Sequence, residues 1–320
     1  MKTDSKFFLL NLCLIFVSCI FLSCGTDSKP MSVEKDNGCG ERTVPSRGFK
    51  TDVAWIVFEW NCKPGGYGSG FLIDKERGAF YTNKHVSNEF DNYGKGSHKL
   101  YFNGKFYNVE IVKVPPLRDA AVVRITDEFD SSEFPEPAPF ATEKVKKGDR
   151  VFVGGFHPHP YTLIEDNKSE GYDEIIVPLY EKYYHLGIRQ LDKREEVVFE
   201  KMEGRIVSLN LTWEAIMKRK NKEIDSGSFT DSLADKTNLF NEILTLKDHK
   251  FPFGGLSGSP ARNSRGEIIG IATRQDTDKF DYDKEELERK GSVEARRMWN
   301  TVFITPIESV ADLRKYPDNK

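Results

Sequence analysis

The chain has 320 residues, of which 30% are charged and 38% belong to the hydrophobic set. This length leaves one large domain or two moderate domains open, and 23 Phe, 12 Tyr and 4 Trp supply enough apolar mass for a packed core. A wholly disordered chain is therefore excluded. Lys and Arg number 47 against 50 Asp and Glu, which gives a formal net charge of −3. Because no basic excess is present to neutralise phosphates, we expect no nucleic-acid partner.

The N-terminus has the pattern of a secretory signal. A short head with Lys2 and Lys6 precedes a mostly apolar run over residues 7–22, which is shorter than the about 20 residues that span a bilayer securely. We expect residues 1–23 to be removed as a signal peptide. No second run of this length occurs in the sequence, so we predict no membrane-spanning helix in the mature chain.

The end of the apolar run resembles the lipobox of bacterial lipoproteins. In that family a small residue precedes a lipidated cysteine, and Ser23 and Cys24 fit this pattern, whereas Phe21 departs from the usual Leu, Val or Ile. The resemblance implies a lipid anchor on Cys24, a place in the bacterial cell envelope facing the periplasm or the cell exterior, and a polar tether over residues 24–51. An ordinary cleaved signal that contains cysteines is the alternative.

Five cysteines are present, and their positions indicate which of them the mature chain would keep. Cys13 and Cys19 leave with the signal, and Cys24 takes the lipid. Cys39 and Cys62 remain, an even number in an exported chain, so a disulfide between them is a hypothesis, with two free thiols as the alternative.

After residue 52 the chain consists of short strand-like runs separated by turn residues, which predicts an all-β fold of the barrel or sandwich type. The dipeptide Asn103-Gly104 between two such runs is a strong hairpin signal. The predicted strands of this part are residues 53–61, 70–73, 79–82, 99–102, 105–114, 120–125 and 150–156.

The middle of the chain, about residues 161–250, is more charged and is predicted to be a partly helical insertion. We expect a helix near residues 213–223 and a second helix or loop over residues 228–248. Strand-like pieces occur at residues 174–179, 196–199 and 204–209, and beyond the insertion we predict strands at 267–273 and 301–304 and helices at 284–298 and 308–316.

Three local patterns carry possible chemistry, in the order His, Asp, Ser. His85 ends a strand, Asp119 precedes a β-branched strand, and Ser257 lies in a loop rich in glycine. A serine hydroxyl needs a base to take its proton, and an imidazole accepts a proton near neutral pH when a carboxylate holds its orientation. Each pattern alone is weak, but their joint occurrence predicts a nucleophilic triad.

Acyl transfer also needs N–H groups that stabilise the developing oxyanion, and Gly255 and Ser257 are the candidate donors. No metal or other cofactor is expected. His157 and His159 form a pair without the further ligands that would complete a four-ligand site, so we interpret them as structural or exposed.

These motifs resemble the trypsin-like (chymotrypsin-fold) serine peptidases, in particular the bacterial glutamyl endopeptidases and the high-temperature-requirement proteases. The resemblance covers about residues 52–316 and implies two six-stranded antiparallel β-barrels with the triad in the cleft between them. His85 and Asp119 would come from the first barrel and Ser257 from the second. The matching segments are GSGF at residues 68–71, TNKHV at 82–86, DAAV at 119–122 and GLSGSP at 255–260.

The chain departs from these relatives in four places. Leu256 stands where the animal digestive branch has an Asp that pairs with a newly cut N-terminus, so activation by that route is not expected. Ala272 stands where the glutamyl endopeptidases have a His, so a preference for cleaving after Glu is not supported. The segment 251–253, Phe-Pro-Phe, hints at an apolar specificity pocket. The chain ends too soon after the peptidase region for the appended peptide-binding domain of the high-temperature-requirement branch.

The sequence therefore predicts a membrane-anchored serine endopeptidase that cleaves polypeptides outside the cytoplasm through an acyl-enzyme. The alternative is a binding or adhesion lipoprotein that keeps the peptidase fold without turnover, because the long insertion is able to cover the cleft. An esterase of the α/β-hydrolase type fits poorly, since that fold has the order Ser, Asp, His. The sequence does not specify the oligomeric state or the substrate.

Overall fold

Alternating side-chain contacts explain why residues 53–58 of the first long strand are all apolar. Strand β3 (Val53–Trp60) places Ala54 and Ile56 in one hydrophobic cluster and Val53, Trp55 and Val57 in another. Because successive side chains of a strand point to opposite faces, such a strand is buried on both faces.

The computed structural model describes residues 33–36, 40–43, 51–60, 63–87, 97–115, 118–158, 197–219, 238–245, 255–275 and 301–315. All of them lie in one compact unit, Ser32–Lys320. Besides β3, the elements are β1 (Val33–Asp36), β2 (Gly40–Thr43), β4 (Lys63–Asp74), β5 (Ala79–Thr82), β6 (Ser97–Phe102), β7 (Lys105–Lys113), β8 (Ala121–Ile125), η1 (Ser131–Glu133), β9 (Arg150–Pro158), β10 (Val197–Thr212), α5 (Trp213–Arg219), β11 (Leu239–Thr245), β12 (Pro260–Arg262), β13 (Ile268–Gln275), β14 (Thr301–Pro306), η2 (Ile307–Ser309) and η3 (Ala311–Arg314).

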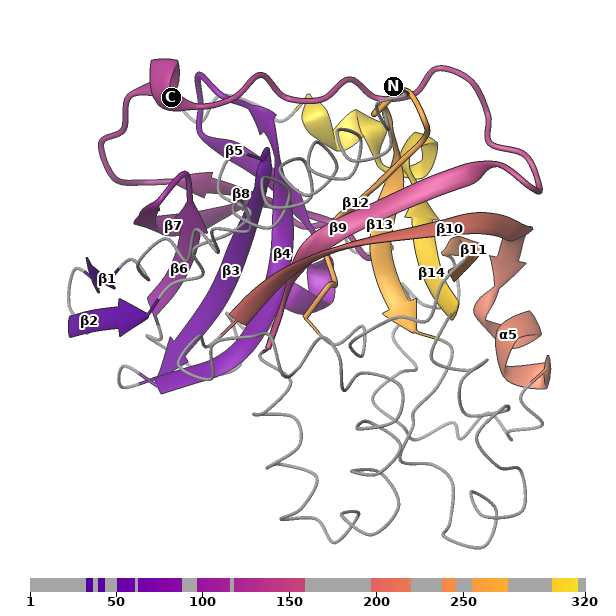
Figure 1. The fold of residues 1–320 in the computed structure, drawn as a ribbon, viewed down its shortest axis with the longest axis horizontal. Coiled ribbons are helices and arrows are strands. Elements are labelled where there is room, and N and C mark those ends of the chain that lie inside the picture. The colour runs from indigo at the N-terminus through magenta and orange to yellow at the C-terminus, as the bar shows by residue number, and fades with distance from the viewer. Residues whose placement is uncertain are drawn as a thin grey trace, which may run out of the picture. The chain divides into compact units, whose positions relative to one another are not determined.

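The strands form two closed, six-stranded barrels, and every strand pairing within them is antiparallel. The strand order is β3-β4-β5-β8-β7-β6 in the first barrel and β10-β11-β14-β13-β12-β9 in the second (Figure 1). The predicted fold class is confirmed. β1 and β2 pair with each other in a separate two-stranded sheet, within the segment for which the sequence predicts a tether.

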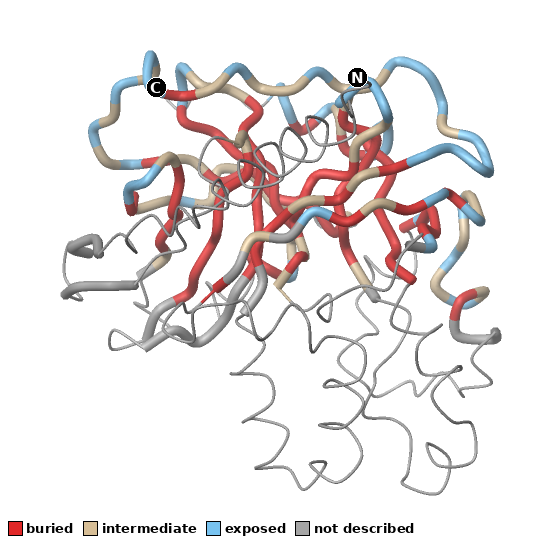
Figure 2. The backbone as a smooth tube through the Cα atoms, viewed as in Figure 1, coloured by how far each residue is buried: buried red, intermediate tan, exposed pale blue. Residues whose placement is uncertain are grey.

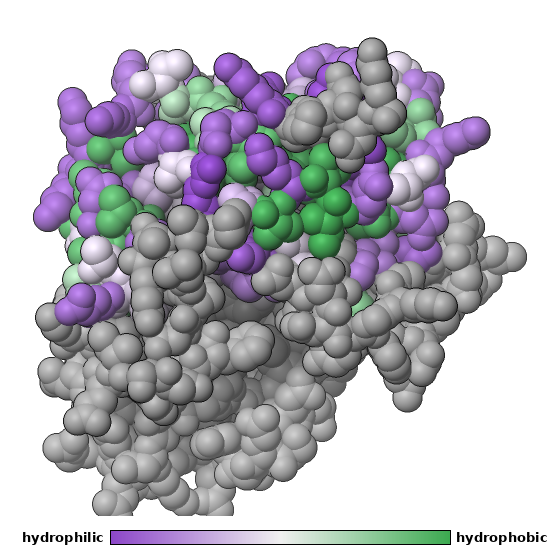
Figure 3. Space-filling model, turned by 180° about the vertical axis from the view of Figure 1, so that it is seen from behind, coloured by the Kyte–Doolittle hydropathy of each residue, from purple (hydrophilic) through white to green (hydrophobic). Residues whose placement is uncertain are grey.

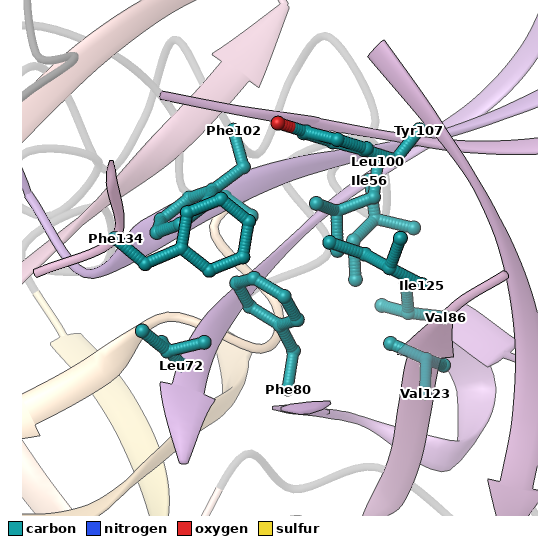
Figure 4. Packing of buried hydrophobic residues seen from close by; sticks show 11 residues of the cluster. Ile56, Leu72, Phe80, Val86, Leu100, Phe102, Tyr107, Val123, Ile125 and Phe134 are labelled. Atoms are coloured by element: carbon teal, nitrogen blue, oxygen red, sulfur yellow. The ribbon is translucent and has the colours of Figure 1, made fainter. Parts of the chain in front are cut away.

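Each barrel is filled by its own side chains. Figure 2 shows buried residues along the strands and exposed residues in the connections between them. In the first barrel, edge-to-face aromatic contacts such as Phe80 with Phe102 and Phe102 with Phe134 fill the interior (Figure 4). The interior of the second barrel is aliphatic and consists of Val151, Val153, Met202, Ile206, Ile243, Leu256, Ala261, Ile269, Ala272, Val302 and Ile304.

Two further apolar clusters join the barrels to each other. In one, Phe71 and Tyr81 of the first barrel pack with Ile268 and Ile271 of β13. In the other, first-barrel residues around Trp55 pack against β9 and β10. A charged contact adds to this, because Arg262 of β12 donates to both carboxylate oxygens of Asp52, at 2.6 and 2.7 Å. The two barrels therefore share buried surface as well as a chain connection.

The turn and strand predictions for the first barrel are confirmed. Asn103 and Gly104 have φ values of 48° and 83°, and two successive positive φ values are typical of the type I′ turn that suits a two-residue hairpin. The predicted strands at residues 196–199 and 204–209 are parts of the single long strand β10, and the predicted helix at residue 213 is α5.

Two predictions were wrong. The helix or loop predicted over residues 228–248 contains β11, a full strand of the second barrel. The predicted terminal helix over residues 308–316 is instead two short 3-10 helices, η2 and η3, because the backbone at Val310 has φ −131°, outside the helical region. The predictions for residues 174–179 and 284–298 lie outside the described residues.

Figure 3 shows hydrophilic residues over much of the described part of one face, with a smaller group of hydrophobic residues near its middle. Among the described residues, no helix has the length and apolar character that crossing a membrane requires.

Candidate active site

His85 and Asp119 form a hydrogen-bonded pair at one end of the first barrel. His85 lies in the helical turn that follows β5, and Asp119 lies two residues before β8, which pairs with β5. The His85 Nδ1 atom is 2.8 Å from Oδ2 of Asp119, and the His85 backbone N–H donates to Oδ1 at 3.0 Å. The Asp119 side chain is 5% exposed and that of His85 is 45% exposed. The carboxylate is thus buried behind an imidazole that still reaches solvent.

The surroundings keep the Asp119 carboxylate ionised despite its burial. Burial alone raises the pKa of this carboxyl. The charge of His85, its side-chain and backbone hydrogen bonds and the charge of Arg274 together outweigh burial, so the pKa of Asp119 lies below its ordinary value. An ionised carboxylate at Nδ1 holds the proton on that nitrogen and leaves Nε2 as the basic atom.

The helical turn that carries His85 is capped in an unusual way. Asn83 precedes the turn, and Asn at such a position ordinarily accepts from an N–H of the first turn through its own side chain. Here the Asn83 amide instead donates to the Asp119 main-chain oxygen at 3.0 Å and to Thr273 Oγ1 at 3.3 Å. The Asp119 carboxylate caps the His85 N–H in its place. Asn83 therefore joins the aspartate loop to β13 of the second barrel.

Ser257 lies in the turn that leads into β12. Gly255 and Gly258 on either side of it have φ values of 87° and 89°, which an L side chain rarely adopts. The turn is closed by a hydrogen bond from the Ser259 N–H to the Leu256 oxygen at 2.9 Å, and the Gly258 N–H donates to the Ala272 oxygen at 2.9 Å. Gly255 and Gly258 thus occur in the serine motif because the turn requires positive φ values at both positions.

The serine loop rests directly on the first barrel. The Ser257 carbonyl accepts a hydrogen bond from the Ser69 N–H at 2.7 Å. A Cβ atom on Gly258 would lie 1.8 Å from the Ser69 oxygen and 2.6 Å from Thr82 Oγ1, so only glycine allows this approach. Because Thr82 lies three residues before His85, the loop of the candidate nucleophile contacts the chain next to the candidate base.

The family of the chain follows from its sequence match. A family model described as "Trypsin-like peptidase domain" matches residues 68–271, which include His85, Asp119 and Ser257. The chain belongs to this family. The antiparallel two-barrel architecture is consistent with the trypsin-like fold.

Solved structures with similarity to this trypsin-like chain are distant. The active form of the Rv3671c protease from M. tuberculosis has 16% sequence identity and a TM-score of 0.47, with 85% of this chain and 83% of that chain covered. Deg5 has 20% identity and a TM-score of 0.46, with 83% and 90% covered. A comparison with curated protein sequences found no match.

Two backbone donors beside the serine of this trypsin-like domain have no acceptor among the described residues. In the part of the chain that the structure describes, neither the Gly255 N–H nor the Ser257 N–H donates a hydrogen bond. Within these residues both N–H groups are candidate donors for an external acceptor, as an oxyanion hole requires. Within the same described ranges, no direct hydrogen bond joins the Ser257 hydroxyl to His85. Such contacts are often long without substrate and tighten in the complex.

Several expected features fall outside the described residues. These are Cys24, Cys39 and Cys62, so the lipid anchor and the disulfide stay predictions, and also the apolar segment at 251–253. Ala272 is described, and it lies buried in β13 with its N–H bonded to the Ser259 oxygen at 2.8 Å. Among the described residues no group of His, Cys, Asp or Glu side chains is arranged to hold a metal ion.

Sequence reasoning did not assign a role to three residues at this site. Asn83, Ser69 and Arg274 each contact or influence the triad region from a different element. Ser69 and Asn83 stand inside the quoted motifs, and both are fully buried polar residues. Their neighbours in the sequence are glycine, threonine and lysine, so no local pattern marks them, and only the contacts with distant segments show why they are buried.

Proposed function

We propose that this chain is a serine endopeptidase in which Ser257 is the nucleophile, His85 the general base and Asp119 the residue that orients and stabilises the imidazole. The observation that supports this most directly is the pair of hydrogen bonds from His85 to the two carboxylate oxygens of the buried Asp119, at 2.8 and 3.0 Å. A carboxylate in this position favours one imidazole tautomer, and it is the tautomer that a base for Ser257 needs.

The proposed reaction has two halves. Ser257 Oγ attacks the carbonyl carbon of a polypeptide substrate while its proton moves to His85 Nε2, and the carbonyl oxygen becomes an oxyanion that accepts from the Gly255 and Ser257 N–H groups. His85 then donates that proton to the leaving amine, which leaves an acyl group on Ser257. A water molecule gives its proton to His85 and attacks the acyl carbon, and the carboxylate product departs as the proton returns to Ser257.

We further propose that the peptidase acts outside the cytoplasm, bound to a membrane through a lipid on Cys24. The support is the signal-like N-terminus and the small residue before Cys24. The full chain expressed in a bacterium should enter the detergent phase in a two-phase extraction and incorporate labelled fatty acid. Cys24→Ala should abolish both. Equal fatty-acid labelling of Cys24→Ala and parent would contradict the anchor and leave the peptidase proposal untouched.

Labelling with a fluorophosphonate probe tests the proposed chemistry. The parent should form a covalent adduct on Ser257, found by peptide mass spectrometry, and hydrolyse unfolded casein. Ser257→Ala should do neither, and His85→Ala should react slower by a few orders of magnitude. Ser259→Ala is the matched control, since Ser259 is a buried serine two residues away and should leave labelling intact. A folded parent that neither labels nor cleaves casein would instead favour the binding lipoprotein.

A further inference from the structure

Ser69 of β4 is a fully buried serine whose polar groups reach three segments of the chain. Its Oγ accepts the Phe156 N–H of β9 at 2.8 Å and lies 3.2 Å from both the Phe156 oxygen and the Gly255 oxygen. Its N–H donates to the Ser257 oxygen at 2.7 Å, and its oxygen accepts from Thr82 Oγ1 at 2.8 Å. Every polar atom of this residue is therefore engaged.

Two of these contacts hold peptide planes of the serine loop. The Gly255 oxygen belongs to the peptide between residues 255 and 256, and the Ser257 oxygen to the peptide between 257 and 258. The Ser257 N–H, an open donor of the site, lies on the peptide between 256 and 257. Ser69 thus binds the two peptide planes that flank the plane carrying the Ser257 N–H. Its hydroxyl contacts the preceding plane at the Gly255 oxygen, and its N–H contacts the following plane at the Ser257 oxygen.

The hydroxyl has one proton to share between two carbonyl oxygens. The Phe156 and Gly255 oxygens are equally distant at 3.2 Å, whereas the accepted bond from the Phe156 N–H is shorter at 2.8 Å. The accepted bond holds Ser69 Oγ in place against β9, at a point from which its proton reaches the Gly255 oxygen as well as the Phe156 oxygen. Gly255 has φ 87°, so its carbonyl direction depends on such a contact and not on side-chain packing of its own.

The close approach of β9 shows that this contact is built into the packing. A Cβ atom at Gly155 would lie 2.8 Å from Ser69 Oγ and 1.7 Å from Ser259 Oγ. Glycine at this position lets β9 reach the Ser69 hydroxyl. Ser259 is equally buried, but its hydroxyl has no hydrogen-bond partner among the described residues, so burial of a serine here does not by itself require the contacts that Ser69 makes.

We propose that Ser69 is a positioning residue for the oxyanion donors, and that its hydroxyl presets the Gly255 and Ser257 N–H groups before substrate binds. This inference rests on the proposed function. Removing one oxyanion donor costs about 100- to 1,000-fold in rate, and a donor that is present but loosely held should cost less. We therefore expect loss of the Ser69 hydroxyl to reduce reactivity by about 10- to 100-fold.

The test compares Ser69→Ala, Ser69→Thr and Ser259→Ala in the full chain, with the second-order rate of fluorophosphonate labelling measured from pH 5 to 9. Ser69→Ala should react about 10- to 100-fold more slowly than the parent. The apparent pKa of its rate profile should be unchanged, because Ser69 does not contact His85 or Asp119. Ser69→Thr keeps the hydroxyl and should recover most of the rate, and Ser259→Ala should match the parent. If Ser69→Ala does not fold, Ser69→Cys fills the same space with a weaker donor and is judged in the same way.

The outcomes separate the two proposals. Equal rates for Ser69→Ala and Ser259→Ala, with a reactive parent, overturn the positioning role and leave the peptidase proposal standing. A slower Ser69→Ala whose apparent pKa also moves overturns it too, since general disruption would then disturb the base as well as the loop. A parent that does not react at all overturns the proposed function itself.

Discussion

The two hydrogen bonds on Asp119 make the substitution Asp119→Asn a sharp test of the triad. Oδ1 accepts from the His85 backbone N–H, a donor whose direction the helical turn fixes. An amide has a single acceptor oxygen, so in the variant that oxygen stays with the backbone donor and the NH₂ group faces Nδ1 of His85. Nδ1 must then accept a hydrogen bond. The imidazole proton moves to Nε2, which can no longer take the proton of Ser257.

The expected magnitude follows from this tautomer change. In a Ser-His-Asp triad with intact geometry and the wrong tautomer, kcat falls about 10⁴-fold, equivalent to about 5.4 kcal/mol in the barrier. Folding should change little, because the amide keeps both contacts to His85 and no longer buries a charge. We therefore expect a folded variant with a melting temperature near that of the parent and almost no labelling of Ser257.

The assay is the rate of fluorophosphonate labelling with a thermal melt on the same samples. Asp130→Asn is the matched control, since Asp130 likewise accepts a backbone N–H, from Ser132 at 2.9 Å, but lies on the surface away from His85. It should label like the parent. If a folded Asp119→Asn keeps more than about a tenth of the parent rate, the tautomer argument is wrong.

Three further predictions concern stability. Gly258→Ala places a Cβ atom 1.8 Å from the Ser69 oxygen, on a residue with φ +89°. It should lower the free energy of unfolding by about 2–5 kcal/mol in a urea titration, and an unchanged urea midpoint would refute the close approach. Arg262→Met removes the Nη2 group that donates to both oxygens of the Asp52 carboxylate, which is 13% exposed, and should lower the free energy of unfolding by about 2 kcal/mol. An unchanged free energy of unfolding would show that solvent replaces the guanidinium. Burial lowers the pKa of His98 to about 4, below its ordinary 6.5, so the contribution of the neutral imidazole to stability is complete above pH 6.5 and is lost as the pH falls toward 4. His98→Phe should therefore reduce the change in the free energy of unfolding between pH 6.5 and 4. An equal change in parent and variant would contradict the low pKa of His98.

The sequence allows the strands to be predicted where the apolar pattern is clean, and the exceptions have a physical cause. β11 was missed because Asn241 and Glu242 are buried although they are polar, so the strand shows neither alternation nor an apolar run. The Asn241 amide oxygen accepts the N–H of Asn210, which has φ 53°, at an irregularity of the β10–β11 pairing. Such a pairing depends on a contact between distant segments, which a local pattern cannot contain.

The same distinction applies to the candidate site. His85, Asp119 and Ser257 stand in local motifs, and a single sequence is enough to identify them as candidates. The residues that hold these motifs together act over long separations, with Ser69 and Gly255 being 186 positions apart and Asn83 and Thr273 190 apart. The periodicity of apolar residues along the sequence does not reveal contacts over such separations, and a buried serine or asparagine could bond many different partners.

The arrangement of these long-range contacts implies that the first barrel fixes the surroundings of Ser257, the proposed nucleophile, which belongs to the second barrel. Ser257 belongs to the second barrel, yet its carbonyl, the glycine after it and the glycine two before it all rest on Ser69 of the first. In the other direction, Asn83 ties the aspartate loop to β13. A small rotation of one barrel against the other would therefore disturb the proposed base, the proposed orienting carboxylate and the proposed oxyanion donors together. The shared apolar clusters that resist such a rotation serve the chemistry as much as the stability of the fold.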